Sequence, residues 1–257
     1  MCSTCGCSGS DHTHTHDHSH DHHHDHSHDH HDHPHHHDNG DGQTSENIAL
    51  EADILGENNR HAAWLRGYFA GRGITAYNLV SSPGSGKTSL LEALVKAIAP
   101  QRPVAVIEGD QQTDNDAARI SACGVPAHQI NTAGGCHLDA HMVIHALDSL
   151  QPQPGSILFI ENVGNLVCPA MFDLGERHRI VVVSVTEGDD KPLKYPYMFR
   201  GSDVCVINKI DLLPYLDSDV ELLKANVAKV NPGMKFFEVS ATKGTGIDAL
   251  VAWLLGE

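Results

Sequence analysis

Short runs of apolar, often β-branched residues alternate with longer amphipathic stretches along the chain after Gly73. The apolar runs are nearly continuous, as is typical of strands that are covered on both faces in a parallel sheet. The strands expected on this basis are 77–81, 104–108, 157–161, 180–186, 204–208 and 236–240. The amphipathic stretches predict helices that begin near Thr88, Asp114, Asp139, Asp219 and Thr245. The alternation predicts a doubly wound α/β domain with a mainly parallel sheet flanked by helices.

The chain before Gly73 divides into two parts of different character. Between Ile48 and Phe69 apolar residues recur at helical intervals, which predicts one or two introductory helices. Residues 8–45 contain almost only His, Asp, Ser, Thr, Gly and Asn, so they bury too little apolar surface to offset the entropy of folding. We therefore expect a cysteine motif at 1–7, a disordered His/Asp-rich linker at 8–45 and a folded domain at 46–257.

Charge and composition exclude several classes of protein. Residues 1–59 carry 12 acidic groups and no basic ones, and the remainder carries 17 basic against 21 acidic groups. Neither part therefore has the excess of basic residues that is typical of proteins that bind nucleic acid. No run approaches the roughly 18–20 apolar residues of a spanning helix, and the start does not resemble a secretory signal. We expect a cytoplasmic protein with no membrane partner. The seven cysteines, three of them crowded together, favour metal or redox chemistry over disulfides.

The segment 81–88, Ser-Ser-Pro-Gly-Ser-Gly-Lys-Thr, ends the first expected strand and opens a helix, which is the context of a phosphate-binding loop. The glycines let backbone N–H groups curl around phosphates, Lys87 would reach the β- and γ-phosphates, and the Thr88 hydroxyl would ligate Mg²⁺. Ser81 replaces the first glycine of the strict pattern, and a chance Gly/Ser-rich turn is the alternative. The nucleotide-binding residues expected here are Gly84, Ser85, Gly86, Lys87, Thr88 and Ser89.

Two tetrapeptides at later strand ends indicate which base is bound. In Asn208-Lys209-Ile-Asp211, the carboxylate could accept two hydrogens from guanine, whereas adenine would leave it unpaired. The segment 240–243, Ser240-Ala241-Thr-Lys, resembles the second base-contacting loop of GTPases. Surface loops rich in Lys and Asp are the alternative, but the two in this order after a phosphate-binding loop favour GTP.

Carboxylates at two further strand ends should lie near the γ-phosphate. We assign Asp110 to Mg²⁺ or the attacking water and Glu161 to the outer Mg²⁺ shell, so that Lys87, Asp110 and Glu161 are the candidate catalytic residues. Gly164, whose N–H could bond the γ-phosphate, is the candidate pivot of a switch. Helix capping is the alternative role for these carboxylates.

Two groups of thiols are candidate metal ligands. Cys2, Cys5 and Cys7 could gather on one soft or borderline ion such as Ni²⁺, Cu⁺ or Zn²⁺, unless they are a redox-active or incidental cluster. The 16 histidines between positions 12 and 37 indicate a metal reservoir, whose metal binding should weaken as acidification protonates the imidazoles. A purification tag is the less convincing alternative. Within the domain, Cys136, His137 and Cys168 would form a site that changes with GTP hydrolysis if they meet near the γ-phosphate; buried structural cysteines are the alternative. Cys123 and Cys205 are interpreted as packing residues, and no role is assigned to His61, His128, His141, His145 and His178.

Taken together, these motifs resemble the hydrogenase nickel-incorporation GTPase family, HypB. The resemblance rests on the Cys2-x2-Cys5-x-Cys7 motif, the His-rich linker, the segment 81–88 and the motifs at 108–110, 134–137, 161–168 and 208–211, and it spans essentially the whole chain. It implies a SIMIBI-like P-loop GTPase that uses GTP/GDP and Mg²⁺ and forms a homodimer. It further implies delivery of Ni²⁺ to the [NiFe]-hydrogenase large subunit together with a small zinc- and nickel-binding partner, HypA.

The resemblance also ranks the two metal sites. It implies that Cys2, Cys5 and Cys7 hold Ni²⁺ tightly, and that Cys136, His137 and Cys168 form a weaker nickel or zinc site. The alternatives are a passive nickel or zinc store, a urease-type nickel-insertion GTPase, and an ATP-dependent P-loop kinase, against which Asp211 argues.

Overall fold

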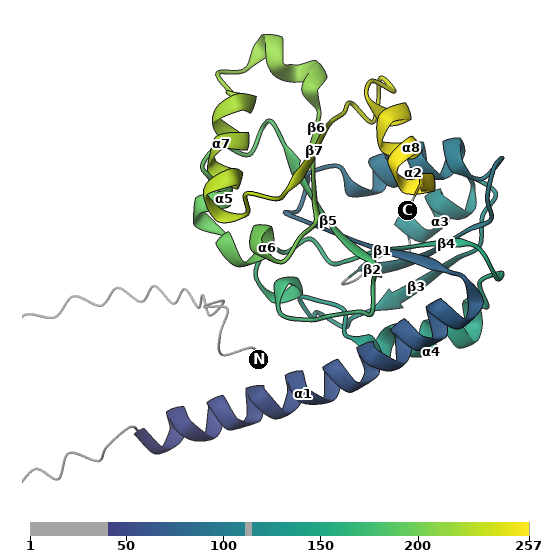
Figure 1. The fold of residues 1–257 in the computed structure, drawn as a ribbon, viewed down its shortest axis with the longest axis vertical. Coiled ribbons are helices and arrows are strands. Elements are labelled where there is room, and N and C mark those ends of the chain that lie inside the picture. Colours follow the sequence, from purple (N-terminus) through teal and green to yellow (C-terminus); the bar gives the residue numbers. More distant parts are fainter. Residues whose placement is uncertain (1–40, 111–114, 257) are drawn as a thin grey trace, which may run out of the picture. The chain divides into compact units, whose positions relative to one another are not determined.

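The computed structural model of the chain describes residues 41–110 and 115–256, with side chains from 52 onwards apart from that of Asn115. The Cys2, Cys5 and Cys7 motif and residues 8–40 of the expected linker lie outside the described residues. The described part is built on a seven-stranded parallel sheet in the order β3-β2-β4-β1-β5-β6-β7 (Figure 1). The strands are β1 (Thr75–Ser81), β2 (Val104–Asp110), β3 (Ala127–Asn131), β4 (Ile157–Glu161), β5 (His178–Ser184), β6 (Val204–Asn208) and β7 (Lys235–Glu238).

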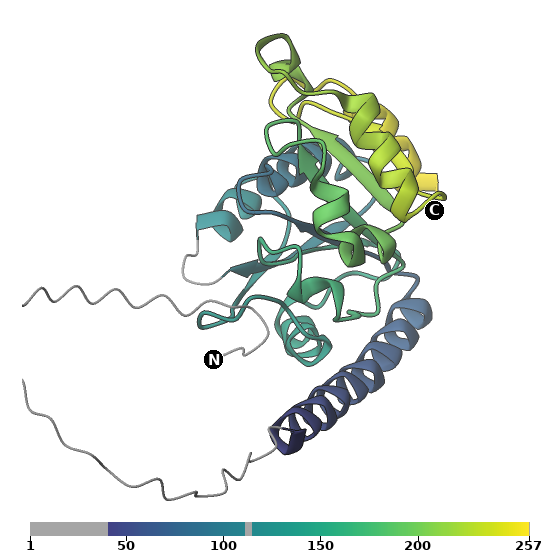
Figure 2. The same ribbon diagram turned by 90° about the vertical axis from the view of Figure 1, so that its left-hand side faces the viewer.

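Helices cover both faces of the sheet, which confirms the doubly wound α/β architecture (Figures 1 and 2). The helices are α1 (Asp41–Arg72), α2 (Lys87–Ile98), α3 (Asn115–Ser121), α4 (Ala140–Leu150), α5 (Lys191–Lys194), α6 (Pro196–Arg200), α7 (Val220–Val230) and α8 (Ile247–Gly256), with 3₁₀ turns η1 (Cys168–Ala170) and η2 (Ile210–Tyr215). Leu79 faces a core that α2, α3 and α8 cover, whereas its neighbour Val80 faces the side that carries α6 and α7. Ala76, on the same side as Val80, packs in the core beneath α1 and α4. Residues that alternate along a strand thus belong to cores on opposite faces.

Several details differ from the elements expected from the sequence, among them the short helices α5 and α6, which were not expected. β3 was not predicted, because His128, Gln129 and Asn131 interrupt its apolar character. It lies at the edge of the sheet, where it has one neighbouring strand, β2. α1 is a single helix that begins at Asp41, so residues 41–45, which were expected in the linker, are helical. β5 and β7 end at Ser184 and Glu238, two residues before the expected ends.

Helix α1 is fastened to the domain by polar contacts as well as by its apolar face. The buried Asn58 donates to the carbonyl of Asp173 at 2.9 Å and accepts from the backbone N–H of Ala140 at 2.8 Å. Arg66 donates to both carboxylate oxygens of Asp173 at 2.8 Å. Gly175 has a φ of +74°, and a Cβ there would lie 2.8 Å from the carbonyl oxygen of Ala62. The loop after η1 therefore lies directly against α1.

The chain order reverses around β1, which lies between β4 and β5. In open α/β sheets ligands bind outside the carboxyl ends of the strands at such a reversal. Within the described residues, none of the helices has the length and apolar character needed to cross a bilayer.

Candidate functional site

The loop between β1 and α2 forms one wall of a cleft of about 410 Å³ at this position. Gly84 and Gly86 have φ angles of +76° and +91°, a left-handed conformation that glycine adopts at little cost. A Cβ on Gly86 would also lie 2.7 Å from Nδ2 of Asn208. No side chain caps the first N–H groups of α2, so they are available to an anion, as in helix N-termini that bind phosphate.

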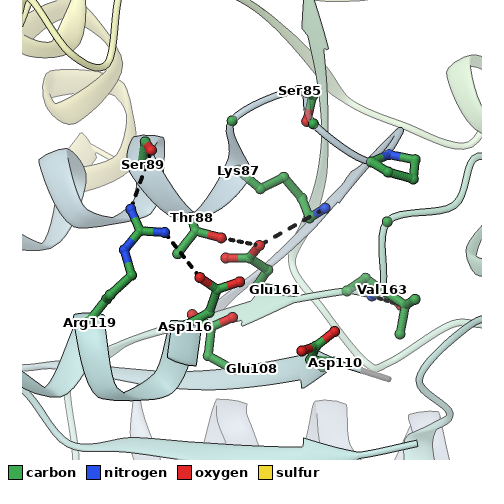
Figure 3. A pocket seen from close by; sticks show the side chains of 16 residues that line it. Ser85, Lys87, Thr88, Ser89, Glu108, Asp110, Asp116, Arg119, Glu161 and Val163 are labelled. Carbon is green, nitrogen blue, oxygen red and sulfur yellow. Dashed lines mark hydrogen bonds and ion pairs between the residues drawn. The ribbon is translucent and has the colours of Figure 1, made fainter. Parts of the chain in front are cut away.

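Lys87, the first residue of α2, lies buried at the base of the cleft (Figure 3). Its Nζ donates to the Ser81 hydroxyl at 2.8 Å and lies 4.0 Å from Oε1 of Glu161. Burial lowers the pKa of Lys87, while the charge of Glu161 opposes that shift. Ser81, which departs from the strict loop pattern, thus orients the lysine that the pattern requires.

Two carboxylates face each other across neighbouring strands beside this lysine. Glu108 of β2 is directly in register with Glu161 of β4, and Thr88 donates to Oε1 of Glu161 at 2.9 Å. Burial, reinforced by the charge of Glu161, raises the pKa of Glu108 to about 10. Burial also raises the pKa of Glu161, against the opposing effect of Lys87. Oε1 of Glu108 and Oε2 of Glu161 are buried without a hydrogen-bond partner. A hard divalent cation such as Mg²⁺ fits this position, because it prefers oxygen ligands and would offset two clustered carboxylates.

The remaining residues expected near the γ-phosphate also line the cleft. Asp110 ends β2, and its backbone carbonyl accepts from Thr132 at 3.0 Å. Gly164 comes shortly after β4 in the chain and packs against the β1–α2 loop. A Cβ on Gly164 would lie 3.1 Å from Cα of Pro83. The segment after β4 therefore contacts the candidate phosphate-binding loop directly.

Two lining residues, Asp116 and Arg119 of α3, were not identified from the sequence. Arg119 donates to Asp116 at 3.0 Å and to Ser89 at 3.5 Å (Figure 3). It also donates to Glu92 at 2.8 Å. The only sequence signal is an acidic and a basic residue three positions apart at the start of a short helix, which is common on solvated surfaces. Their place in the cleft depends on how α3 packs beside α2.

The two tetrapeptides expected to contact a base lie side by side and hold the β1–α2 loop. Asn208 donates to the carbonyl of Ser85 at 3.0 Å and accepts from the N–H of Ala241 at 3.2 Å. Lys209, with a left-handed φ of +63°, donates from Nζ to the carbonyl of Gly84 at 2.6 Å. Oδ1 of Asp211 accepts from the Ser240 hydroxyl at 2.5 Å. The tertiary structure thus joins the ends of β6 and β7 to the same loop.

Cys136, His137 and Cys168 come together, and we call them the cysteine–histidine cluster. Their ligand atoms all lie within 4.8 Å of one another, and Sγ of Cys136 is 3.6 Å from Nδ1 of His137. The His137 ring stacks on Phe172, with centroids 3.8 Å apart. Burial lowers the pKa of His137, and the charge of Asp139 opposes this shift. The lowered pKa favours the neutral imidazole, which is the form that binds metal. Two thiols and one imidazole suit a borderline ion such as Ni²⁺ or Zn²⁺.

The cysteine–histidine cluster is hydrogen bonded to the cleft through Leu138. The backbone N–H of Leu138, next to His137, donates to Oδ1 of the buried Asn162 at 3.1 Å. Asn162 lies between Glu161 and Gly164, and it lines the cleft. Gly109 of β2 approaches Leu138 so closely that a Cβ would lie 2.8 Å from its Cγ. The ends of β2 and β4 therefore both contact the segment that carries two of the three ligands.

The cysteines interpreted as packing residues lie elsewhere. Cys205 is fully buried in β6, where burial raises the pKa of its thiol to about 12. Cys123 is half-buried after α3, packs against the core beneath α2 and donates from Sγ to the carbonyl of Arg119 at 3.5 Å.

Comparison with known proteins finds similarity over most of the chain. Residues 75–238 match the family model for the CobW/HypB/UreG nucleotide-binding domain. The hydrogenase maturation factor HypB of Azotobacter vinelandii is 58% identical over 82% of this chain and 69% of its own length. HypB of Escherichia coli strain K12 is 55% identical over 80% of this chain and 71% of its own length. The crystal structure of Helicobacter pylori HypB in complex with nickel has a TM-score of 0.74 and 39% identity, covering 78% of this chain and 94% of that chain.

Proposed function

Because the chain belongs to the CobW/HypB/UreG family, and within it to the HypB hydrogenase maturation factors, we propose that it hydrolyses GTP and uses the cycle to store and deliver nickel. The observation that carries this proposal is the hydrogen bond from Leu138 to Asn162, which joins the cysteine–histidine cluster to the nucleotide cleft. A ligand that moves the segment after β4 would thereby alter how firmly the cluster holds an ion.

In the proposed nucleotide site the β1–α2 loop binds the phosphates and the ends of β6 and β7 bind guanine. Backbone N–H groups of Gly84, Ser85 and Gly86 and the N-terminus of α2 cradle the phosphates, with Ser89 completing the first turn. Asp211 accepts hydrogens from guanine, while Asn208, Lys209, Ser240 and Ala241 hold the base-contacting segments in place. The side-chain contacts within this set join the base-contacting segments to the phosphate-binding loop.

Hydrolysis proceeds by in-line attack of water on the γ-phosphate. Lys87 stabilises the negative charge that develops on the phosphate oxygens, Asp110 orients the water, and Gly164 donates its N–H to the γ-phosphate. Thr88, Asp110 and Glu161 would hold Mg²⁺, which neutralises phosphate charge when bound. Intrinsic turnover is slow, because Arg119, the arginine that lines the cleft, is already engaged by Glu92 and Asp116.

The metal cargo is nickel, with zinc as the competing ion. The exchangeable ion is held by Cys136, His137 and Cys168. A second Ni²⁺ is held tightly by Cys2, Cys5 and Cys7. The protein acts in the cytoplasm. The nickel named for the similar Helicobacter pylori structure supports this choice of cargo. The partners are a second copy of this chain, a HypA-type nickel and zinc protein, and the [NiFe]-hydrogenase large subunit.

Nickel affinity should be measured in the presence of GTP and of GDP on one sample that lacks the three N-terminal thiols. We expect a coupling free energy of about 1–3 kcal/mol, which is roughly 5- to 150-fold in affinity. Cys136→Ala should abolish the nucleotide-dependent part. Cys123→Ala, which removes a half-buried thiol outside the cluster, is the matched control and should retain it. Equal nickel affinity in both nucleotide states would overturn the proposal.

Passive metal storage is a second candidate, favoured by the 16 histidines between positions 12 and 37. Deleting residues 8–40, which contain all 16 of these histidines and end before α1, separates the two functions. Storage predicts that nearly all nickel capacity disappears with the histidines, whereas delivery predicts that the nucleotide-dependent site of the domain survives.

A further inference from the structure

A buried arginine at the start of β5 holds the segment that follows Cys168. Arg179 is the second residue of this strand. Its guanidinium donates from Nη1 to the carbonyl of Ala170 at 3.1 Å and from Nη2 to the carbonyl of Phe172 at 2.9 Å. Ala170 ends η1, the turn that begins at Cys168, and the ring of Phe172 stacks on His137. One side chain therefore fixes the backbone beside the cysteine–histidine cluster.

The charge of Arg179 is balanced by Glu176, and both side chains are at most 10% exposed. Nε of Arg179 donates to Oε1 of Glu176 at 3.0 Å, and Nη2 lies 2.9 Å from the same oxygen. Oε2 of Glu176 accepts from the backbone N–H of Leu174 at 2.7 Å. The planar guanidinium carries its donors in a fixed fork, so it can hold two carbonyls and a carboxylate in one geometry, which a lysine cannot do.

Glu176 is in turn hydrogen bonded toward the nucleotide cleft. Nδ2 of Asn78, in the middle of β1, donates to Oε1 of Glu176 at 3.0 Å. Nδ2 of Asn162 donates to Oδ1 of Asn78 at 3.4 Å. Neither asparagine is more than 1% exposed, so bulk water does not compete for these bonds. A series of buried polar groups thus runs from Asn162, which lines the cleft, to the carbonyls after Cys168.

Two branches of hydrogen bonds therefore begin at the Asn162 side chain. Its Oδ1 accepts from the N–H of Leu138, next to His137, and its Nδ2 begins the series that reaches η1 through Asn78. The first branch holds the segment that carries two of the three ligands, and the second holds the turn that begins at Cys168. Because the ligands come from two segments distant in sequence, their separation depends on what holds both segments in place.

We propose that Arg179 is a positioning residue of the cysteine–histidine cluster, which acts with Glu176 and Asn78 to keep Cys168 beside the other two ligands and to couple it to the nucleotide cleft. None of these three side chains lines the cleft or belongs to the cluster, so they act through the backbone of η1 and through Asn162. The coupling to nucleotide rests on the proposed GTP-driven nickel cycle, whereas the positioning of Cys168 does not.

The positioning role is tested without nucleotide, in the full chain with Cys2, Cys5 and Cys7 replaced by Ala. Absorbance of the nickel–thiolate bond then reports the cysteine–histidine cluster. Arg179→Lys keeps the charge that Glu176 requires but cannot hold both carbonyls. Nickel affinity should fall about 10- to 100-fold, as is typical when groups that orient metal ligands are replaced, and the thiolate band should shift because the Cys168 sulfur is no longer fixed. Parent-like affinity and an unchanged band would overturn the proposal.

Arg102→Lys is the matched control. Arg102 likewise donates to two backbone carbonyls, those of Gly155 at 2.7 Å and Gly73 at 3.5 Å, but it does so at the amino ends of the strands, away from the cluster. This variant should keep the nickel affinity and the band of the parent. GTP affinity should be the same in both lysine variants, which shows that the domain is folded. If Arg179→Lys does not fold, Glu176→Asp retains both charges while drawing back the carboxylate, and it should weaken nickel binding in the same direction; parent-like binding there would equally overturn the proposal.

The coupling role is tested with Asn78→Leu, which has nearly the same shape but removes the hydrogen bonds between Asn162 and Glu176. Arg179 keeps its carbonyls, so nickel affinity without nucleotide should stay close to that of the parent. The ratio of nickel affinities with GTP and GDP should fall by roughly 2- to 30-fold, the range expected for residues that transmit coupling. An unchanged ratio would show that this branch carries no signal. Equal affinities with GTP and GDP in the parent would instead overturn the proposed cycle, and the effect of Arg179→Lys without nucleotide would remain.

Discussion

Replacing Asn162 by Ala should separate the nucleotide cleft from the cysteine–histidine cluster. Oδ1 of this buried side chain accepts from the backbone N–H groups of Leu138 at 3.1 Å and Val163 at 3.0 Å. A buried donor without a partner costs about 1–3 kcal/mol, so two such donors give about 2–6 kcal/mol. Water that enters the vacated space satisfies part of this loss, and we expect a decrease of about 2–3 kcal/mol in the free energy of unfolding.

The functional consequence of this substitution is distinct from its effect on stability. Without the bond to Leu138, a movement of the segment after β4 no longer displaces His137, so nickel affinity should become the same with GTP and GDP. Asn226→Ala is the matched control, since Asn226 is a buried asparagine of α7 that donates to the carbonyl of Asp189 at 2.9 Å, away from both sites.

Urea unfolding gives the stability of both variants, and nickel titration with each nucleotide gives the coupling. The control should lose stability and keep the coupling. If Asn162→Ala retains the full difference in nickel affinity between GTP and GDP, the hydrogen bond does not transmit the signal and the reasoning is refuted.

Three further predictions concern single side chains. Lys87→Ala should lower the rate of GTP hydrolysis by roughly 10²–10³ in single-turnover assays, because it removes charge stabilisation at the phosphate; an unaltered rate would contradict its catalytic role. Asp211→Ala should reduce the preference for GTP over ATP roughly 10- to 150-fold in competition binding, since a hydrogen bond to a charged group contributes about 1.5–3 kcal/mol; an unchanged preference would show that guanine is recognised elsewhere. Burial raises the pKa of the Cys205 thiol to about 12, so at pH 9 only about one thiol in a thousand is the reactive thiolate. The thiolate fraction increases as the pH rises toward the pKa. Iodoacetamide at pH 9 should therefore modify Cys123 but not Cys205 in the folded protein, and mass spectrometry of the native sample would expose the opposite result.

Local sequence determined most of the strands and the nucleotide motifs. Short apolar runs such as that of β6 are typical of strands covered on both faces, and the structure buries this strand at every position. The motifs at the ends of such strands then follow from the direction of a parallel sheet. The same logic anticipated that Cys136, His137 and Cys168 could meet, although sequence spacing did not show that they do. β3 escaped because its strand character comes from pairing with β2 and not from its half-polar residues.

Other features depend on contacts between elements that sequence periodicity does not specify. Periodicity shows which face of a helix is apolar, but the crossing of two helices and the distance between their polar faces depend on packing. Arg119 lines the nucleotide cleft because α3 packs beside α2, and His61 lies beside His141 because Asn58 joins α1 to α4. The sequence by itself therefore determined the fold class and the chemistry of each strand end. Only the tertiary structure decided which of these groups share a cleft, because hydrogen bonds and close packing between segments distant in sequence set those distances.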